Sequence, residues 1–182
     1  MTKKQKKQPT WSDVKTRLTD FDRAGLLALV QDLYTASKDN RAFLHARFSL
    51  GDDALKPYKA TIARWLYPDV LRSQDISIAK AKKAISDYKK AVGQAEGLVE
   101  LAVFYCEQAT AFCDDYGLQD EGYFDATVRM FETALKTIAQ LPETRRQPFW
   151  SRLDAVRRIS HNFGYYVGDE MDELLAEYQV DS

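Results

Sequence analysis

The chain holds few residues whose type and spacing fit a catalytic or metal-binding chemistry. His45 and His161 are the only histidines, and neither has a Cys, His or carboxylate at a spacing with which helices bind metal ions. Two Ser-x-x-Lys matches, beginning at Ser12 and Ser86, lack the Ser-Asp-Asn and Lys-Thr-Gly sequences that accompany this motif in Ser–Lys enzymes. Glycine-rich phosphate loops are also missing. The sequence therefore predicts a protein that is not an enzyme, with no catalytic residue, metal site or cofactor.

Three carboxylates recur every seven residues, at Glu100, Glu107 and Asp114. On a helix this spacing places them in one column along one side. Carboxylate pairs bind metals or transfer protons, but helical di-metal sites also use Glu-x-x-His pairs, which this sequence lacks. If helices 76–92 and 96–116 fold as a hairpin around Gly93, the column meets part of the lysine face of the preceding helix. Such exposed pairs would orient the helices more than they stabilise them.

The stretch from Lys56 to Lys90 has the most biased composition in the chain. It contains nine Lys and Arg against three Asp, a net charge of +6. Helical phasing places its lysines opposite an apolar seam. The candidate interaction surface consists of Lys56, Lys59, Arg64, Lys80, Lys83 and Lys90.

Three interpretations of this basic surface are open. It is the solvated face of a helix, or it binds nucleic-acid phosphates without sequence preference and with a steep salt dependence. Alternatively, it docks onto an acidic protein surface, for which the acidic C-terminal segment of a second copy is a candidate. Residues 1–92 carry 19 Lys and Arg against 10 Asp and Glu, whereas residues 93–182 carry 7 against 17. This division indicates either a half that faces a polyanion or two halves that attract one another.

Apolar residues recur with helical spacing along the chain, and no stretch shows the sustained alternation of a strand. The sequence predicts an all-α fold of about seven to eight mostly antiparallel helices, in a bundle or a short solenoid-like stack. Expected helices lie at 11–18, after the cap residues Asp22, Asn40 and Asp53, at 76–92 and 96–116, from Asp120 to Leu141, from Pro148 to Ile159, and at 169–178.

Specific residues set the expected boundaries and burial of these helices. After Asp22, apolar residues at i, i+3, i+4, i+7 and i+8 predict a helix with one buried stripe. The helix at 96–116 is the most hydrophobic and should be central. Pro68 should end one helix at Tyr67, and Gly93 and Gly117 should end two others in the left-handed conformation. The buried stripe after Asp22 consists of Leu26, Leu29, Val30, Leu33 and Tyr34.

The length of 182 residues fits one domain with its own core. We expect a disordered basic tail over residues 1–10 and a single helical domain over 11–182. Cys106 and Cys113 would lie about 10 Å apart on one helix, too far for a disulfide. Without a signal peptide or an apolar run of 18 residues, the expectation is a reduced cytoplasmic protein that does not enter a membrane.

Several short stretches resemble an uncharacterised family of small all-helical bacterial proteins, a domain of unknown function. They are the helix from Leu26 to Tyr34, the KPYK, YPD and KAKKAISDYKK sequences between Lys56 and Lys90, and Tyr105-Cys106-Glu107-Gln108 followed by Tyr116-Gly117. The resemblance covers about residues 20–140. It implies a bacterial cytoplasmic helical domain and assigns no activity.

Together these features predict a non-enzymatic helical scaffold or protein-interaction domain. Its basic surface between Lys56 and Lys90, or its acidic C-terminal helix, would engage a protein partner or a second copy. Non-specific binding of nucleic acid through the same basic surface is the alternative.

Overall fold

Nine α-helices and two short 3₁₀ helices follow one another in the part of the chain that the structure describes, and that part contains no strand. The structure is a computed structural model that describes residues 8–48, 50 and 53–180. Its contacts divide the chain into two units, residues 1–44 and 45–182. The predicted all-α fold is confirmed.

The first unit contains α1 (Trp11–Leu18) and α2 (Arg23–Ala36), and α3 (Lys38–Arg47) runs from it into the second unit. Asp22 caps α2 as predicted, because its side chain accepts a hydrogen bond from the Gly25 amide. The predicted cap at Asn40 is wrong. Asn40 lies inside α3, and its side-chain amide donates to the carbonyl of Leu33 instead.

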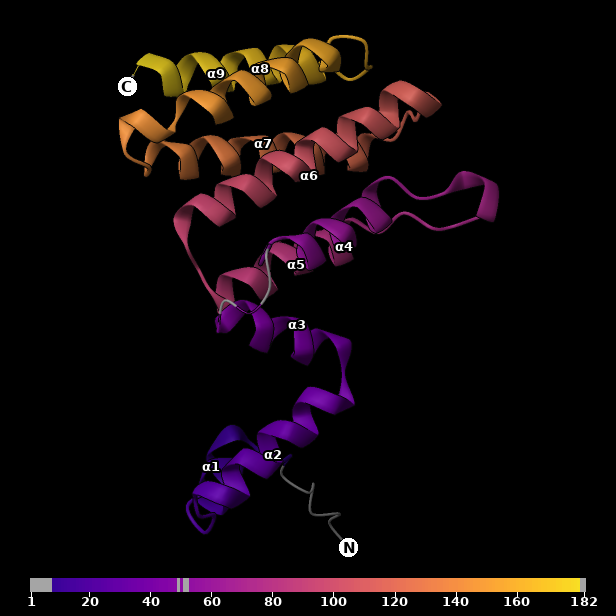
Figure 1. The fold of residues 1–182 in the computed structure, drawn as a ribbon. Coiled ribbons are helices and arrows are strands. Elements are labelled where there is room, and N and C mark those ends of the chain that lie inside the picture. Colours follow the sequence, from indigo (N-terminus) through magenta and orange to yellow (C-terminus); the bar gives the residue numbers. More distant parts are fainter. Residues whose placement is uncertain (1–7, 49, 51–52, 181–182) are drawn as a thin grey trace, which may run out of the picture. The chain divides into compact units, whose positions relative to one another are not determined.

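The second unit stacks six helices in three layers of two, as Figure 1 shows. α4 (Lys56–Leu66) packs beside α5 (Ile78–Ala91) in one outer layer, and α8 (Gln147–Ser160) packs beside α9 (Val167–Val180) in the other. Between them lie α6 (Ala95–Tyr116) and α7 (Glu121–Ala139). The short 3₁₀ helices Val70–Arg72 and Glu143–Arg145 lie in the α4–α5 and α7–α8 connections. The short connections make sequence neighbours pack in pairs.

Most helix ends of this unit lie where the sequence predicts them. Pro57 occupies the first turn of α4, where its missing N–H removes no hydrogen bond. That helix ends at Leu66, directly before the Tyr67-Pro68 break. Gly117 ends α6 with φ 64°, and Gly93 has φ 67°. Both are left-handed values that glycine adopts at little cost.

The core of the second unit is built around α6, as expected from its hydrophobicity. Side chains of this helix are buried over more than one narrow stripe, and Val99, Leu101 and Tyr105 are among those fully buried. Tyr123 of α7 donates its hydroxyl proton to the Leu66 carbonyl at 2.8 Å, which ties the end of α4 to the middle layer. α6 therefore supports both outer layers.

Cys106 and Cys113 are buried free thiols, as predicted. Burial raises the pKa of the Cys113 thiol to about 12 and raises that of Cys106 as well. Among the described helices, none combines the length and the apolar character needed to cross a membrane. Residues 1–7 of the predicted tail lie outside the described residues.

Candidate interaction surfaces

Trp65 lies at the junction of α4 and α5 and carries two cations over its ring. The Lys80 ammonium lies 3.7 Å from the ring centroid, and the Arg64 guanidinium carbon lies 4.4 Å from it. Both distances are within cation–π range. This contact is possible because Arg64 and Trp65 lie in the last turn of α4, and Lys80 lies in the first turn of the adjacent helix α5. Two of the predicted site residues are thereby brought together around one aromatic side chain.

Lys83 and Lys90 continue this basic edge along α5. They follow Lys80 by three and ten residues, which keeps all three on one side of the helix. Lys83 pairs with Asp87 at 2.5 Å, whereas Lys90 is exposed and has no ion-pair partner among the described residues. We call Arg64, Lys80, Lys83 and Lys90 the basic face; with Asp87 it carries a net charge of +3.

Lys59, another of the predicted residues, does not belong to this face. It turns towards α6, where its ammonium lies 2.6 Å from a carboxylate oxygen of Glu100 and 5.4 Å from the ring centroid of Phe104. Lys56 is exposed at the start of α4 without an ion-pair partner in the described part of the chain. Of the six predicted cations, Lys59 therefore binds a carboxylate of the middle layer.

The acidic column of α6 binds partners other than those predicted. Glu100 pairs with Lys59 of α4 and with Arg152 of α8 at 2.5 Å, and Glu107 accepts from Arg152 at 2.7 and 2.8 Å. The expected contact with the lysines of α5 is wrong, because α5 packs chiefly against α4. Asp114, the third member of the column, is exposed. Lys59, Glu100, Glu107 and Arg152, here called the Arg152 network, join all three layers.

Burial opposes ionisation of Glu100, but hydrogen bonds from Arg152 and Lys59 outweigh this effect and hold its pKa below the ordinary value. The two cations and two carboxylates of the network sum to zero charge. Each charged group has a partner at hydrogen-bond distance, so the network is a structural clamp between the layers.

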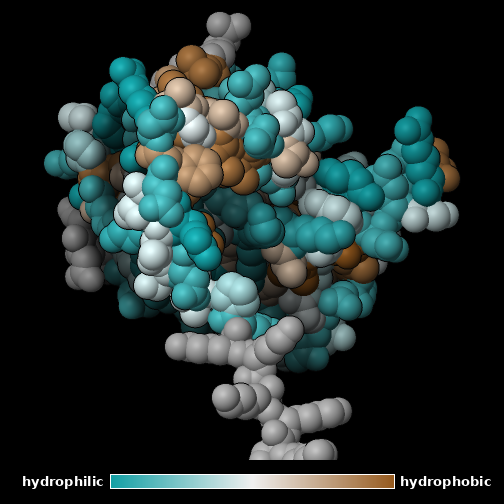
Figure 2. All heavy atoms as spheres, turned by 90° about the horizontal axis from the view of Figure 1, so that it is seen from below, coloured by the Kyte–Doolittle hydropathy of each residue, from teal (hydrophilic) through white to brown (hydrophobic). Residues whose placement is uncertain are grey.

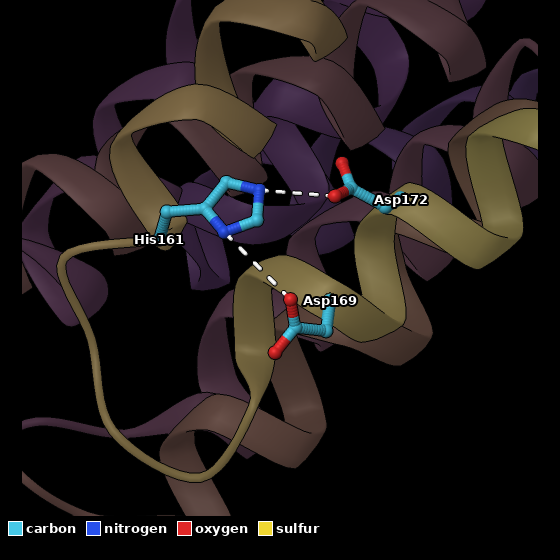
Figure 3. A group of neighbouring side chains, drawn as sticks. All are labelled: His161, Asp169 and Asp172. Atoms are coloured by element: carbon cyan, nitrogen blue, oxygen red, sulfur yellow. Dashed lines mark ion pairs between the residues drawn. The ribbon is translucent and has the colours of Figure 1, made fainter.

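His161 lies between two carboxylates of α9, as Figure 3 shows. Its Nε2 is 3.1 Å from Asp172 and its Nδ1 is 4.0 Å from Asp169. These three side chains are close enough to hold a metal ion. However, the carboxylates face different ring nitrogens, and Asp172 also accepts from Arg157 at 2.6 Å. Because each carboxylate lies nearer a different ring nitrogen, the arrangement is poorly suited to three ligands converging on one ion.

His161 is the C-cap residue of α8. Sequence reasoning does not find its two aspartates, which follow eight and eleven residues later across a turn. Close packing brings them together. A Cβ on Gly168 would lie 2.5 Å from His161 Nδ1, so the start of α9 approaches the imidazole as closely as only glycine allows.

The helices α1 and α2 expose apolar side chains that sequence reasoning expects to be buried. No residue of either helix is buried. The predicted helix after Asp22 is therefore present, but the prediction that its apolar stripe is buried is wrong. Figure 2 shows apolar side chains among hydrophilic ones on the face of the molecule that it presents. The large exposed apolar side chains of α1, α2 and the connection between them, here called the apolar face, are Trp11, Val14, Phe21, Leu26, Leu27, Val30 and Leu33.

No family model, no curated protein and no solved structure matches this chain. The resemblance of its KPYK, YPD and KAKKAISDYKK sequences to a family of helical bacterial proteins therefore stays a prediction. The candidate surfaces are judged on their geometry and charge alone.

Proposed function

We propose that this protein is a non-enzymatic interaction domain that binds an acidic protein surface through the basic face of α4 and α5. The observation that carries the proposal is the pair of cations over Trp65, which continues into Lys83 and Lys90 along one edge of α5. Asp87 is the one carboxylate within this edge.

The stacking on Trp65 favours carboxylates as the partner groups. An aromatic ring holds Arg64 and Lys80 in place, so less side-chain entropy is lost when a carboxylate pairs with them. A guanidinium also donates two parallel hydrogen bonds to a carboxylate. Such a surface accelerates association and sets specificity more than it adds affinity, and salt weakens it.

One feature makes nucleic acid a poorer fit for the same face. Its tryptophan already carries two cations over its ring, which leaves the indole less open to stacking with a base.

The acidic helix α9 is one acidic surface with which the basic face can pair, provided that it comes from a second copy. α9 carries five Asp and Glu between Asp169 and Glu177 and no Lys or Arg. It lies in the opposite outer layer from α5 within the second unit (Figure 1). The two helices therefore cannot meet within one molecule, and a contact between copies through them would be head to tail.

The test is a fluorescence-anisotropy titration with three labelled probes: poly-glutamate, single-stranded DNA and duplex DNA of similar charge. Lys83→Glu/Lys90→Glu reverses two cations of the basic face. Arg129→Glu/Lys136→Glu on α7 is the matched control, since it changes the net charge equally and also breaks pairs with carboxylates four residues away.

We expect poly-glutamate to bind wild type at about 50 mM salt and to be released at about 500 mM. The variant of the basic face should bind it about tenfold more weakly or worse, whereas the control should stay near wild type. Equal affinities for the two variants would refute the proposal. Binding of DNA without binding of poly-glutamate would assign the face to nucleic acid.

A further inference from the structure

We propose that the apolar face of α1 and α2 is the interface through which two copies of this chain form a dimer. This contact is separate from the basic face, because its residues lie in the first unit and the basic face lies in the second. It would be symmetric, so that the same side chains meet on both copies.

The composition of α2 shows why this helix needs a cover. Only Arg23 and Asp32 among its 14 residues are charged. Leu26, Val30 and Leu33 follow one another at spacings of four and three and so form one stripe. Leu33 is 51% exposed, and Leu27 beside the stripe is 61% exposed. A helix with so few charges is typical of a buried position, and helices of 8 and 14 residues are marginal in water without tertiary packing.

The exposed area is of the size that a stable dimer requires. An aromatic side chain offers about 150–250 Å² when fully exposed, and a Val or Leu side chain roughly 100 Å². Weighted by their exposed fractions, the seven side chains of the apolar face present on the order of 500 Å². A standard interface buries about 800 Å² per partner, of which a little more than half is apolar. Pairing the two faces would therefore supply the apolar part of such an interface.

The charges around this face favour a second copy over other partners. Residues 8–44 carry five Lys and Arg and five Asp, so this part of the chain is neutral and identical surfaces do not repel one another. A strongly charged protein finds no complementary field there. A helix that lies on a membrane has a polar face rich in Lys and Arg, whereas the polar side of α2 holds Gln31, Asp32 and Thr35.

The mass of the full chain in solution, measured by light scattering over a range of concentrations, tests this inference. We expect twice the chain mass of 20.9 kDa, at low salt and at about 500 mM salt alike, because apolar contacts are not screened. Loss of the dimer at high salt would instead indicate the contact between the basic face and α9. A mass of 20.9 kDa at every concentration would overturn the inference, and cosedimentation of that monomer with phosphatidylcholine vesicles would assign the face to lipid.

Val30→Glu/Leu33→Glu should raise the dimer dissociation constant on the order of 100-fold, because two charges enter the centre of the interface. Val70→Glu/Leu71→Glu is a matched control, since it introduces the same changes at two exposed residues of the second unit. The control should remain dimeric. If both variants dimerise as wild type does, α2 is not the interface.

A cross-linking measurement keeps the inference testable if the α2 variant loses its helix. Leu27→Cys should give a covalent dimer with a short bismaleimide, whereas Leu71→Cys at the same protein concentration should not. Cys106 and Cys113 do not interfere, because both are buried and the pKa of each thiol is raised. Equal cross-linking from the two positions would contradict a specific contact through α2.

Discussion

Replacing Arg152 by Met should lower the free energy of unfolding of the second unit, because Arg152 is partly buried and binds two carboxylates. The guanidinium donates to Glu107 at 2.7 and 2.8 Å and to Glu100 at 2.5 and 3.2 Å. Its side chain is 30% exposed, and that of Glu100 is 19% exposed. Methionine keeps much of the apolar contact of the arginine stem. It leaves two half-buried carboxylates on α6 with Lys59 as the remaining cation of the Arg152 network.

The magnitude follows from the lost hydrogen bonds and the stranded charges. Breaking a fully buried pair costs about 3–5 kcal/mol, and partial exposure to water reduces this, so we expect about 2–3 kcal/mol for Arg152→Met. Arg145→Met is the matched control, because Arg145 also binds one carboxylate, Glu96, with two contacts at 2.6 and 2.8 Å. That pair is 59% and 51% exposed, so water screens it and its loss should cost far less than the loss of Arg152.

The assay is urea unfolding followed by circular dichroism, with the free energy of unfolding taken from the midpoint at an unchanged slope. Equal losses for Arg152→Met and Arg145→Met would refute the claim that burial makes the network a clamp. A pH series gives a second reading. Hydrogen bonds from Arg152 and Lys59 hold the pKa of Glu100 below its ordinary value in the wild type. The stability that Arg152 adds is therefore present above about pH 4.5 and is lost as pH falls through the lowered pKa, so the deficit of the variant should shrink there. A deficit that grows there would contradict the same reasoning.

Two further predictions concern single side chains. Gly97→Ala would place a Cβ 2.0 Å from the Tyr88 hydroxyl oxygen and should cost about 1–3 kcal/mol in urea unfolding. Gly122→Ala, whose Cβ meets nothing closer than 3.5 Å, should instead gain up to about 1 kcal/mol; losses of equal size would contradict the packing around Tyr88. Arg157 lowers the pKa of Asp172 by donating a hydrogen bond to it. This pair therefore stabilises the fold above about pH 4 and is lost as pH falls through the lowered pKa. In thermal melts, the margin by which wild type exceeds Asp172→Asn should shrink as pH falls below about 4.

The helices could be predicted because their signals are local. The side chains of Asp22 and Asp120 accept hydrogen bonds from the amides of Gly25 and Tyr123, as N-cap residues do. Such a cap depends only on a few neighbouring residues. Asn40 has the residue type of a cap but lies within α3, since Ser37 three residues earlier already accepts an amide proton. Where two cap candidates follow one another, local rules do not choose between them.

The partners of charged residues could not be predicted in the same way. The column on α6 is visible as a seven-residue repeat, but its cations come from Lys59 and Arg152, which lie 41 and 52 residues from Glu100 in the sequence. Pairing depends on which helices become neighbours. The lysine-rich helix α5, which directly precedes α6 in the sequence, was the simplest candidate for the partner of the acidic column. However, α5 turns its apolar side to α4 and its lysines outwards.

The same distinction explains the apolar face of α1 and α2. Spacing at i, i+3 and i+4 predicts that Leu26, Val30 and Leu33 share one side of a helix, and that part is confirmed. Burial was inferred from the spacing because a domain buries its apolar stripes against itself. The spacing of the stripe does not determine which surface covers it. A second copy can remove these apolar side chains from water as a neighbouring helix does. An amphipathic helix that is exposed in its own unit is therefore a positive sign of association, whereas for the lysines of α5 exposure is the ordinary state of a charged side chain.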